Sequence, residues 1–278
     1  MMAGLYKYPS VLTIAGSDSG GGAGIQADLK TFSAYGCFGS SAITAVTVQN
    51  TIGVTAVHHI PSEIVLQQIK AVMDDIKPWA VKIGMIPNAR TAMDIATILR
   101  LYPDVPIIFD PVMISSSGYR LMEDITVDVL KTKLFPLITL ITPNLDETRL
   151  ITGLDIKHIE DMEVAAGCFI ELGCNAVLIK GGHLGQDKLC DVYLDKNGIK
   201  IRFESVYIDS NNTHGTGCTL SSAIAAGLAL GYDMITAIKK AEIYVHEAIA
   251  HGKDVKTGNG HGPLNHFFDP QPMVKLKY

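Results

Sequence analysis

The chain has 278 residues, 47% of them hydrophobic, and a formal net charge of −5. This length permits one or two domains, and the composition is that of a globular protein with a large buried core. The lack of a basic run argues against nucleic acid as a partner, and five cysteines without a CxxC pair or zinc-like spacing favour reduced thiols in the cytoplasm.

Short apolar runs alternate along the chain with longer amphipathic segments. Residues 1–10 carry one lysine and only a short apolar run, so they are not expected to be a signal peptide. The apolar runs are predicted strands, at residues 11–15, 80–83, 107–109, 137–142, 176–180 and 191–194. The amphipathic segments are predicted helices, at residues 22–35, 62–75, 88–101, 123–134, 144–152, 159–172, 216–230 and 233–250.

This alternation predicts an α/β fold. Continuous apolar strands separated by helices indicate a mostly parallel central sheet with helices on both faces, a three-layer helix–sheet–helix arrangement. Because the chain contains no linker, repeat or low-complexity tract, residues 1–278 are expected to form a single domain. The uncharged stretch 215–232 contains four glycines and several Ser and Thr residues, so we expect a buried helix there and no membrane contact.

Polar residues follow four of the predicted strands. They are Gly16-Ser-Asp18, Asp110, Thr142-Pro-Asn144 and Lys180-Gly-Gly-His183. Ligands of parallel α/β sheets bind beyond the carboxyl ends of the strands. Each of these segments alone is compatible with an ordinary turn, but four at the same edge of a sheet predict a binding site.

Two acidic residues among these segments are candidates for binding a metal ion. Asn144 and Glu147 have the spacing of a capping box, which would account for both without any ligand. With Asp110 nearby, Glu147 would instead provide a second carboxylate for Mg²⁺, which takes few carboxylates when it also holds phosphates. Lys180 ends a buried strand, where its charge needs either a phosphate or a carboxylate as partner.

The segment His214-Gly-Thr-Gly-Cys218 lies where a turn passes into a predicted helix. The first amides of a helix lack intrahelical acceptors and point toward the positive end of its dipole, which favours an anion. Gly-x-Gly alone is compatible with a plain turn. Helix N-termini lower thiol pKa values, so Cys218 is expected to be partly ionised beside a bound phosphate.

Together, these groups suggest phosphoryl transfer. The candidates include anion-binding amides, a lysine, two acids for Mg²⁺ and a base, and transfer of a phosphoryl group depends mainly on positioning and charge neutralisation. A second glycine cluster, residues 19–24, lacks the GxGxxG spacing of a dinucleotide site. The chain also has no GxxxxGK[ST] motif, so it is not a P-loop kinase.

A known family carries the same motifs in the same order. AGSDSGGGAGIQADLKT (15–31), VQNT (48–51), KIGM (82–85), DPVM (110–113), ITPNLDE (141–147), KGGH (180–183) and NTHGTGCTLS (212–221) resemble the hydroxymethylpyrimidine and phosphomethylpyrimidine kinases of thiamin biosynthesis. These enzymes have a ribokinase-like fold. The resemblance runs from about residue 10 to the GPLNHF segment at 262–267.

The resemblance implies a chemistry and a set of residue roles. ATP would phosphorylate 4-amino-5-hydroxymethyl-2-methylpyrimidine and then its monophosphate. Cys218 would be the catalytic base, Gly215, Thr216 and Gly217 the anion hole, and Lys180 the cation beside the triphosphate. Asp110, Asn144 and Glu147 would organise Mg²⁺, and the pyrimidine would lie against Gly16, Asp28, Gln49, Met85 and Val112.

Gln49 also has a physical reason to bind such a ring. A 4-aminopyrimidine edge presents an N–H donor beside a ring-nitrogen acceptor, and a glutamine amide matches both. A glutamine in a surface loop is the simpler alternative. Met85 and Val112 are compatible with core packing as well as with the apolar walls of a ring pocket.

Two other functions remain open at this stage. Some bacterial relatives with the same cysteine phosphorylate pyridoxal or pyridoxine, although Gln49 and the intact KGGH motif favour the thiamin branch. The other alternative is a non-catalytic pyrimidine-binding module on the same fold, which would have no need of Asp110, Glu147, Lys180 and Cys218 together. A homodimer is expected from the resemblance alone.

Overall fold

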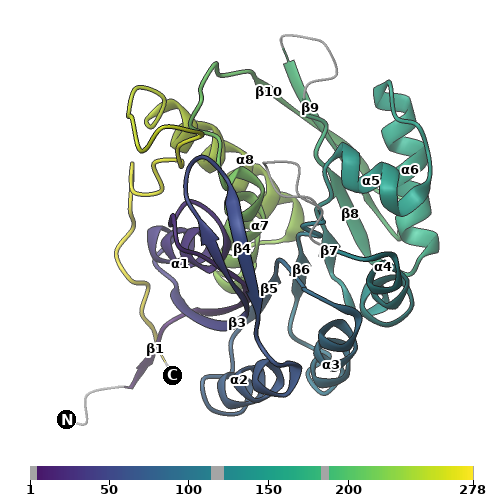
Figure 1. Ribbon diagram of the computed structural model, residues 1–278, viewed down its shortest axis with the longest axis vertical. Coiled ribbons are helices and arrows are strands. Elements are labelled where there is room, and N and C mark those ends of the chain that lie inside the picture. Colours follow the sequence, from purple (N-terminus) through teal and green to yellow (C-terminus); the bar gives the residue numbers. More distant parts are fainter. Residues whose placement is uncertain (1–4, 114–121, 183–187, 278) are drawn as a thin grey trace.

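The computed structural model describes residues 5–113, 122–182 and 188–277 of the chain (Figure 1). His183 of the KGGH motif therefore lies outside the described residues. None of the helices in the described ranges is both long enough and apolar enough to cross a lipid bilayer.

A nine-stranded sheet forms the centre of the fold (Figure 1). Its strands, from one edge to the other, are β10 (Lys200–Val206), β9 (Lys188–Asp195), β8 (Ala176–Ile179), β7 (Leu140–Ile141), β6 (Ile107–Phe109), β5 (Ala80–Ile83), β2 (Ser10–Asp18), β3 (Phe38–Gln49) and β4 (Val54–His59). All neighbouring pairs from β8 across to β3 are parallel, whereas the pairs β3–β4, β8–β9 and β9–β10 are antiparallel. The predicted mostly parallel sheet is confirmed. A separate pair joins β1 (Tyr6–Lys7) to β11 (Leu276–Lys277) near the two ends of the chain.

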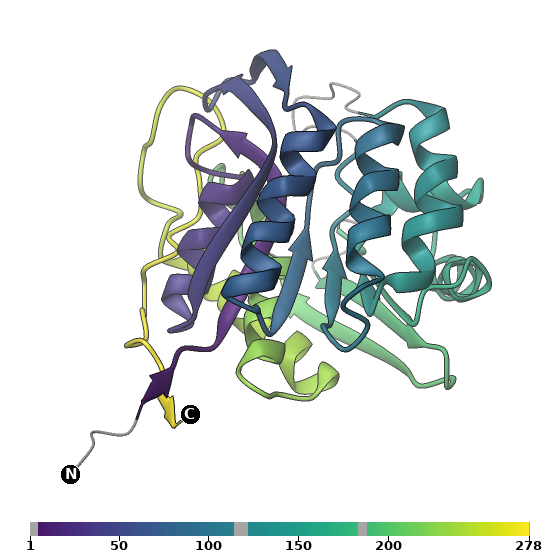
Figure 2. The ribbon, with the colours of Figure 1, turned by 90° about the horizontal axis from the view of Figure 1, so that it is seen from below.

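Helices cover both faces of the sheet. One layer contains α2 (Ser62–Asp75), α3 (Ala89–Leu99), α4 (Asp124–Val129), α5 (Leu145–Thr152) and α6 (Ile159–Glu171). The other layer contains α1 (Gly24–Ala34), α7 (Thr216–Ala229) and α8 (Met234–Ala250). Figure 2 shows α2 and α3 side by side on their face of the sheet. The predicted three-layer arrangement is therefore confirmed.

The strand sequences explain why two layers are needed. Leu12 and Ile14 of β2 belong to the core under α2 and α3, whereas Val11 belongs to the core under α7. Likewise, Phe109 faces the first core and Ile108 the second. All five side chains are fully buried. A strand that is apolar on both faces must be covered on both faces, which is what the continuous apolar runs predicted.

The edges of the sheet differ from the prediction. β3, β4 and β10 were not predicted, because β4 is mostly exposed and every second residue of β10 faces solvent. The predicted strand 137–142 shortens to Leu140–Ile141, since a 3₁₀ turn occupies Phe135–Leu137. The predicted helix 123–134 divides into α4 and a π-helical segment, Leu130–Leu134.

Candidate active site

A cavity of about 500 Å³ opens at the carboxyl ends of the parallel strands. Its walls come from the ends of β2, β3, β5, β6 and β8, and from the start of α5 and of α7. It is lined by every predicted site residue except Asp28, namely Gly16, Gln49, Met85, Asp110, Val112, Asn144, Glu147, Lys180, Gly215, Thr216, Gly217 and Cys218. The structure thus brings together residues from distant parts of the chain at the predicted edge of the sheet.

The start of α7 forms one wall of the cavity. Gly215 precedes the helix with a φ of 86°, a left-handed conformation that favours glycine, and a Cβ there would collide with the carbonyl oxygen of Gly22. The amides of Gly217 and Cys218 lie in the first turn, where a helix offers no intrahelical acceptor. Both residues line the cavity, so the wall offers amide donors at a positive helix end.

Cys218 lies in this first turn, half-buried at the cavity wall. Burial raises the pKa of its thiol to about 11. The charge of Lys82 and a hydrogen bond from the amide of Gly24 act in the opposite direction, while Asp28 and Asp110 raise the pKa further. In the ligand-free protein, burial and the two carboxylates therefore oppose the ionisation that is expected beside a bound phosphate.

Lys180 and Asp110 form an ion pair opposite α7. Lys180 Nζ is 2.8 Å from Asp110 Oδ1, and both side chains are largely buried. Burial by itself lowers the pKa of Lys180, but the charges of Asp110 and Glu147 outweigh it and raise the pKa, so the ammonium stays charged. A Cβ on Gly217 would lie only 3.0 Å from Lys180 Nζ, which shows how closely the ammonium approaches the start of α7.

Asn144 and Glu147 form the capping box that their spacing indicates. The Glu147 amide donates to Asn144 Oδ1 at 2.9 Å, and the Asn144 amide donates to Glu147 Oε2 at 2.8 Å. Burial raises the pKa of Glu147 to about 7; Lys180 opposes this rise, and Asp110 adds to it. In the three ranges that the structure describes, no group of three or more His, Cys, Asp or Glu side chains could hold a metal ion.

Asp28, for which a contact with the pyrimidine was predicted, does not line the cavity. It is fully buried on α1, where it accepts hydrogen bonds from Thr13 Oγ1, Ser222 Oγ and Lys82 Nζ at 2.6 to 2.9 Å. Lys82 is the member of this group that reaches the cavity wall. Lys82 was not predicted as a site residue, although a lysine inside the apolar strand Ala-Val-Lys-Ile is a signal for a buried charge.

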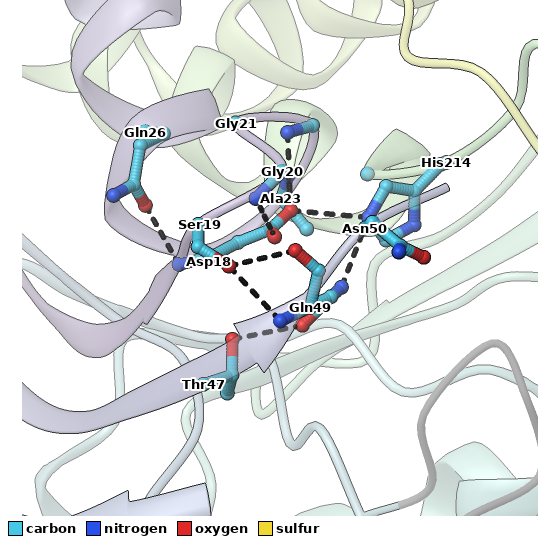
Figure 3. Close-up of polar contacts among 12 residues, drawn as sticks. Asp18, Ser19, Gly20, Gly21, Ala23, Gln26, Thr47, Gln49, Asn50 and His214 are labelled. Carbon is cyan, nitrogen blue, oxygen red and sulfur yellow. Dashed lines mark hydrogen bonds and ion pairs between the residues drawn. The ribbon is translucent and has the colours of Figure 1, made fainter. Parts of the chain in front are cut away.

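Two apolar side chains and a glutamine amide also line the cavity. Gly16, Met85 and Val112 line it, and a Cβ on Gly16 would lie 3.3 Å from Met85 Sδ. Gln49 ends β3, and its amide contacts Thr47 Oγ1 at 3.0 Å and His214 Nε2 at 3.1 Å (Figure 3). An apolar wall beside a fixed amide is suited to a flat ring with polar atoms on one edge.

The glycine-rich loop between β2 and α1 is organised around Asp18 (Figure 3). The Asp18 carboxylate accepts hydrogen bonds from the amides of Gly20, Gly22 and Ala23, and the Gly21 amide donates to the Asp18 carbonyl. All four amides are thus directed toward one residue of the loop. The carboxylate also contacts His214 Nε2 at 3.2 Å. Asp18 was predicted to lie at this edge of the sheet, but no role was predicted for Asp18 or His214.

Comparisons with known proteins agree with the motifs. Residues 18–265 match the protein-family model for phosphomethylpyrimidine kinase. The chain is 48% identical over 257 residues to the hydroxymethylpyrimidine/phosphomethylpyrimidine kinase of Rhizobium meliloti, a match that spans 92% of this chain and 96% of that protein.

Two solved structures are also similar. The phosphomethylpyrimidine kinase from Clostridium difficile has a TM-score of 0.77 and 46% identity, over 86% of this chain and 99% of that one. The pyridoxal kinase of Bacillus subtilis, solved as an ADP complex, has a TM-score of 0.85 and 34% identity, over 94% of this chain and 98% of that one. These likenesses confirm the expected ribokinase-like fold. The chain belongs to the phosphomethylpyrimidine kinase family.

Proposed function

We propose that this protein transfers the terminal phosphoryl group of ATP to the hydroxymethyl oxygen of 4-amino-5-hydroxymethyl-2-methylpyrimidine, and then phosphorylates the resulting monophosphate. Family membership makes the chain a phosphotransferase. The relative from Rhizobium meliloti carries both substrates in its name, and the related pyridoxal kinase was solved with ADP, which supports a nucleotide donor. The whole chain, residues 1–278, is taken as one catalytic domain.

One observation carries the proposal: a single cavity holds the start of α7, the Lys180–Asp110 pair and the Gln49 amide. Partial positive charge comes from the amides of Gly217 and Cys218, and a full positive charge comes from the ammonium of Lys180. Both stabilise a phosphoryl group during its transfer. Gln49, which contacts His214 just before α7, would bind the ring edge. The hydroxymethyl group of the ring would then face α7 and the thiol.

Cys218 is proposed as the group that receives the proton of the attacking hydroxyl. Because the pKa of its thiol is raised to about 11, only a small fraction is thiolate at neutral pH in the ligand-free protein. A loose transition state needs the proton to leave late, so a scarce base still contributes. The charge of Lys82 is the strongest influence that favours the thiolate.

The residues present fit Mg²⁺ as the metal. Asp110 and Glu147 provide two carboxylates, and the charge of Asp110 raises the pKa of Glu147, a repulsion that a divalent cation would relieve. Two carboxylates, with water and phosphate oxygens, are the donor set that Mg²⁺ prefers. Asn144 Oδ1 is engaged in the capping box, so its contribution would be secondary. When bound, Mg²⁺ would neutralise phosphate charge.

The test is product analysis by mass after the enzyme is incubated with MgATP and the pyrimidine alcohol. We expect one added phosphate and then two. Absence of any phosphorylated pyrimidine, with the protein folded, would refute the proposal. Phosphorylation that stops at the monophosphate would refute the second step alone.

Pyridoxal phosphorylation is the second candidate, favoured by the TM-score of 0.85 with a pyridoxal kinase. The higher identity to the pyrimidine kinases, 48% against 34%, ranks the pyrimidine first. Parallel measurements of kcat/KM would reverse this ranking if the value for pyridoxal were the larger. A purely binding module is excluded by any Mg²⁺-dependent consumption of ATP that requires the alcohol.

We also propose a cytoplasmic location and a homodimer. All five cysteines are free thiols, which suits a reducing compartment. The homodimer is carried over from the family resemblance, and sedimentation equilibrium of the purified protein tests it directly.

A further inference from the structure

The side chain of Gln49 is held from two directions (Figure 3). Its Nε2 lies 3.1 Å from His214 Nε2, and its Oε1 lies 3.0 Å from Thr47 Oγ1. Because Gln49 lines the cavity, these two contacts determine how its amide faces a bound ring. The oxygen and nitrogen of a side-chain amide are assigned from their hydrogen-bond partners, so the chemistry of the two neighbours decides the orientation.

The first neighbour, His214, lies between Gln49 and Asp18. Burial by itself raises the pKa of Asp18, but hydrogen bonds from His214 and from the amides of Ala23 and Gly20 outweigh it and hold the pKa below its usual value. Asp18 is therefore a carboxylate, which only accepts hydrogen bonds. His214 Nε2, 3.2 Å from Asp18 Oδ2, must carry a hydrogen, whether the ring is neutral or protonated. The Gln49 atom beside that nitrogen must then be an acceptor.

The second neighbour, Thr47, leads to the same result independently. Its Oγ1 lies 3.0 Å from the backbone carbonyl oxygen of Ser17, which only accepts. The single hydroxyl hydrogen of Thr47 is used there, so Thr47 presents a lone pair to Gln49. The Gln49 atom beside Thr47 must therefore be a donor.

Both neighbours require the amide nitrogen at Thr47 and the amide oxygen at His214, the reverse of the orientation drawn in Figure 3. In the drawn orientation, the amide nitrogen would face the N–H of His214, which places two donors together. In the reversed orientation, the His214 Nε2 hydrogen is shared between two acceptors, Asp18 Oδ2 and the amide oxygen. We propose that Asp18 and His214 are positioning residues that hold the Gln49 amide in this reversed orientation. It then presents one N–H and one oxygen lone pair in a fixed order, which selects a ring edge with a complementary order of donor and acceptor.

The surrounding contacts keep this arrangement rigid. Ser19 Oγ accepts from the Gln49 amide at 2.9 Å and donates to the Gln49 carbonyl at 2.6 Å, so the same loop also fixes the backbone of Gln49 (Figure 3). The His214 ring packs against Gly22, where a Cβ would approach within 2.5 Å of His214 Cδ2. His214 is only 11% exposed. Asp18, Ser19 and His214 thus orient Gln49 as positioning residues and are not themselves reacting groups.

This inference takes its substrate from the proposed function. Its test compares two compounds whose ring edges present donor and acceptor in opposite order. In the 4-aminopyrimidine alcohol, an exocyclic N–H donor adjoins a ring-nitrogen acceptor. In the 4-oxo analogue, an exocyclic oxygen acceptor adjoins a ring N–H, so the order is reversed. We compare kcat/KM for the two compounds in the wild type, in His214→Leu and in His214→Gln, which keeps an N–H donor.

We expect the wild type to prefer the amino compound. In His214→Leu the preference should fall by roughly two- to tenfold, the range for one net hydrogen bond, through KM, because the amide becomes free to reverse. His214→Gln should retain most of the preference. A purely structural role of His214 would lower both rates equally and leave the ratio unchanged, and that result would overturn the inference.

A second measurement does not depend on activity. ¹⁵N NMR of the ligand-free enzyme, assigned with His214→Gln, should show His214 Nε2 protonated. An unprotonated Nε2 at neutral pH would overturn the proposed orientation. A wild type that phosphorylates neither compound would refute the proposed function, and this NMR measurement would still decide the orientation of Gln49.

Discussion

Lys82 and Asp28 form an ion pair in which both side chains are fully buried, with Lys82 Nζ 2.8 Å and 2.9 Å from the two carboxylate oxygens. Burial by itself lowers the pKa of Lys82, but the charge of Asp28 outweighs it and raises the pKa. Thr13 and Ser222 donate to the same carboxylate. The pair therefore keeps a positive charge in the wall of the cavity, next to Cys218.

Removing either partner of this pair should strongly destabilise the protein. Lys82→Met leaves the Asp28 carboxylate buried without its cation, and we expect a loss of about 3–5 kcal/mol in the free energy of unfolding, measured in urea. The double variant Lys82→Met/Asp28→Leu should lose much less than the two single losses added together. Additive losses would show that the two side chains act independently.

Cys218 should control how the rate depends on pH. A thiol with a pKa of about 11 gains thiolate with each increase in pH below that value, so kcat should rise between about pH 7 and pH 10. Cys218→Asp, whose carboxylate is ionised throughout, should flatten this profile. Cys218→Ala should lower kcat by about 10²-fold or more while leaving pyrimidine affinity largely intact. Comparable turnover in Cys218→Ala would remove the base assignment and leave the kinase assignment standing.

The start of α7 should not tolerate a side chain at Gly217. An added Cβ would lie 3.0 Å from Lys180 Nζ and 3.4 Å from Asp110 Oδ2, so the ammonium must move. We expect Gly217→Ala to lower kcat/KM by about tenfold or more, because small displacements in a transfer site are costly.

Gly167 of α6 provides the matched control, since a Cβ there meets nothing within 4 Å. Gly167→Ala should leave activity unchanged and stabilise the protein by roughly 0.5–1 kcal/mol through helix propensity. Equal activities for the two alanine variants would show that Gly217 is not needed for the approach of Lys180.

Gln49→Leu should weaken pyrimidine binding. The variant leaves the donor and acceptor of the ring edge without partners, and we expect a loss of about 1–3 kcal/mol, measured by calorimetry with the pyrimidine alcohol. The kcat at saturating substrate should change less than KM. An unchanged Kd would show that Gln49 does not contact the ring.

The parallel centre of the sheet was predictable because its strands are apolar on both faces. Ile107–Phe109 is buried at every position, and Asp110 directly follows it, so the strand and its functional residue were identified together. β10 was missed because its half-buried residues alternate with exposed ones at a sheet edge. Such strands depend on their neighbours more than on their own hydrophobicity.

The features of the site that were not predicted arise from contacts between distant segments. The helix start at Cys218 is a local feature, and it correctly indicated amides at the cavity wall. The pKa of its thiol depends also on burial and on Asp28, Asp110 and Lys82, none of which is near it in sequence. The family resemblance placed Asp28 beside the ligand, because its pairing with Lys82, 54 residues away, is visible only in the folded chain.

The loop around Asp18 has a consequence for the order of events. Its amides from Gly20 to Ala23 are all directed at Asp18, so these four amides are not available to a phosphate. The start of α7 offers such amides at the cavity wall. Two successive phosphoryl transfers at one site require the acceptor to move back by the length of one phosphate between them. The enzyme must therefore release the monophosphate, or shift it within the cavity, before the second transfer.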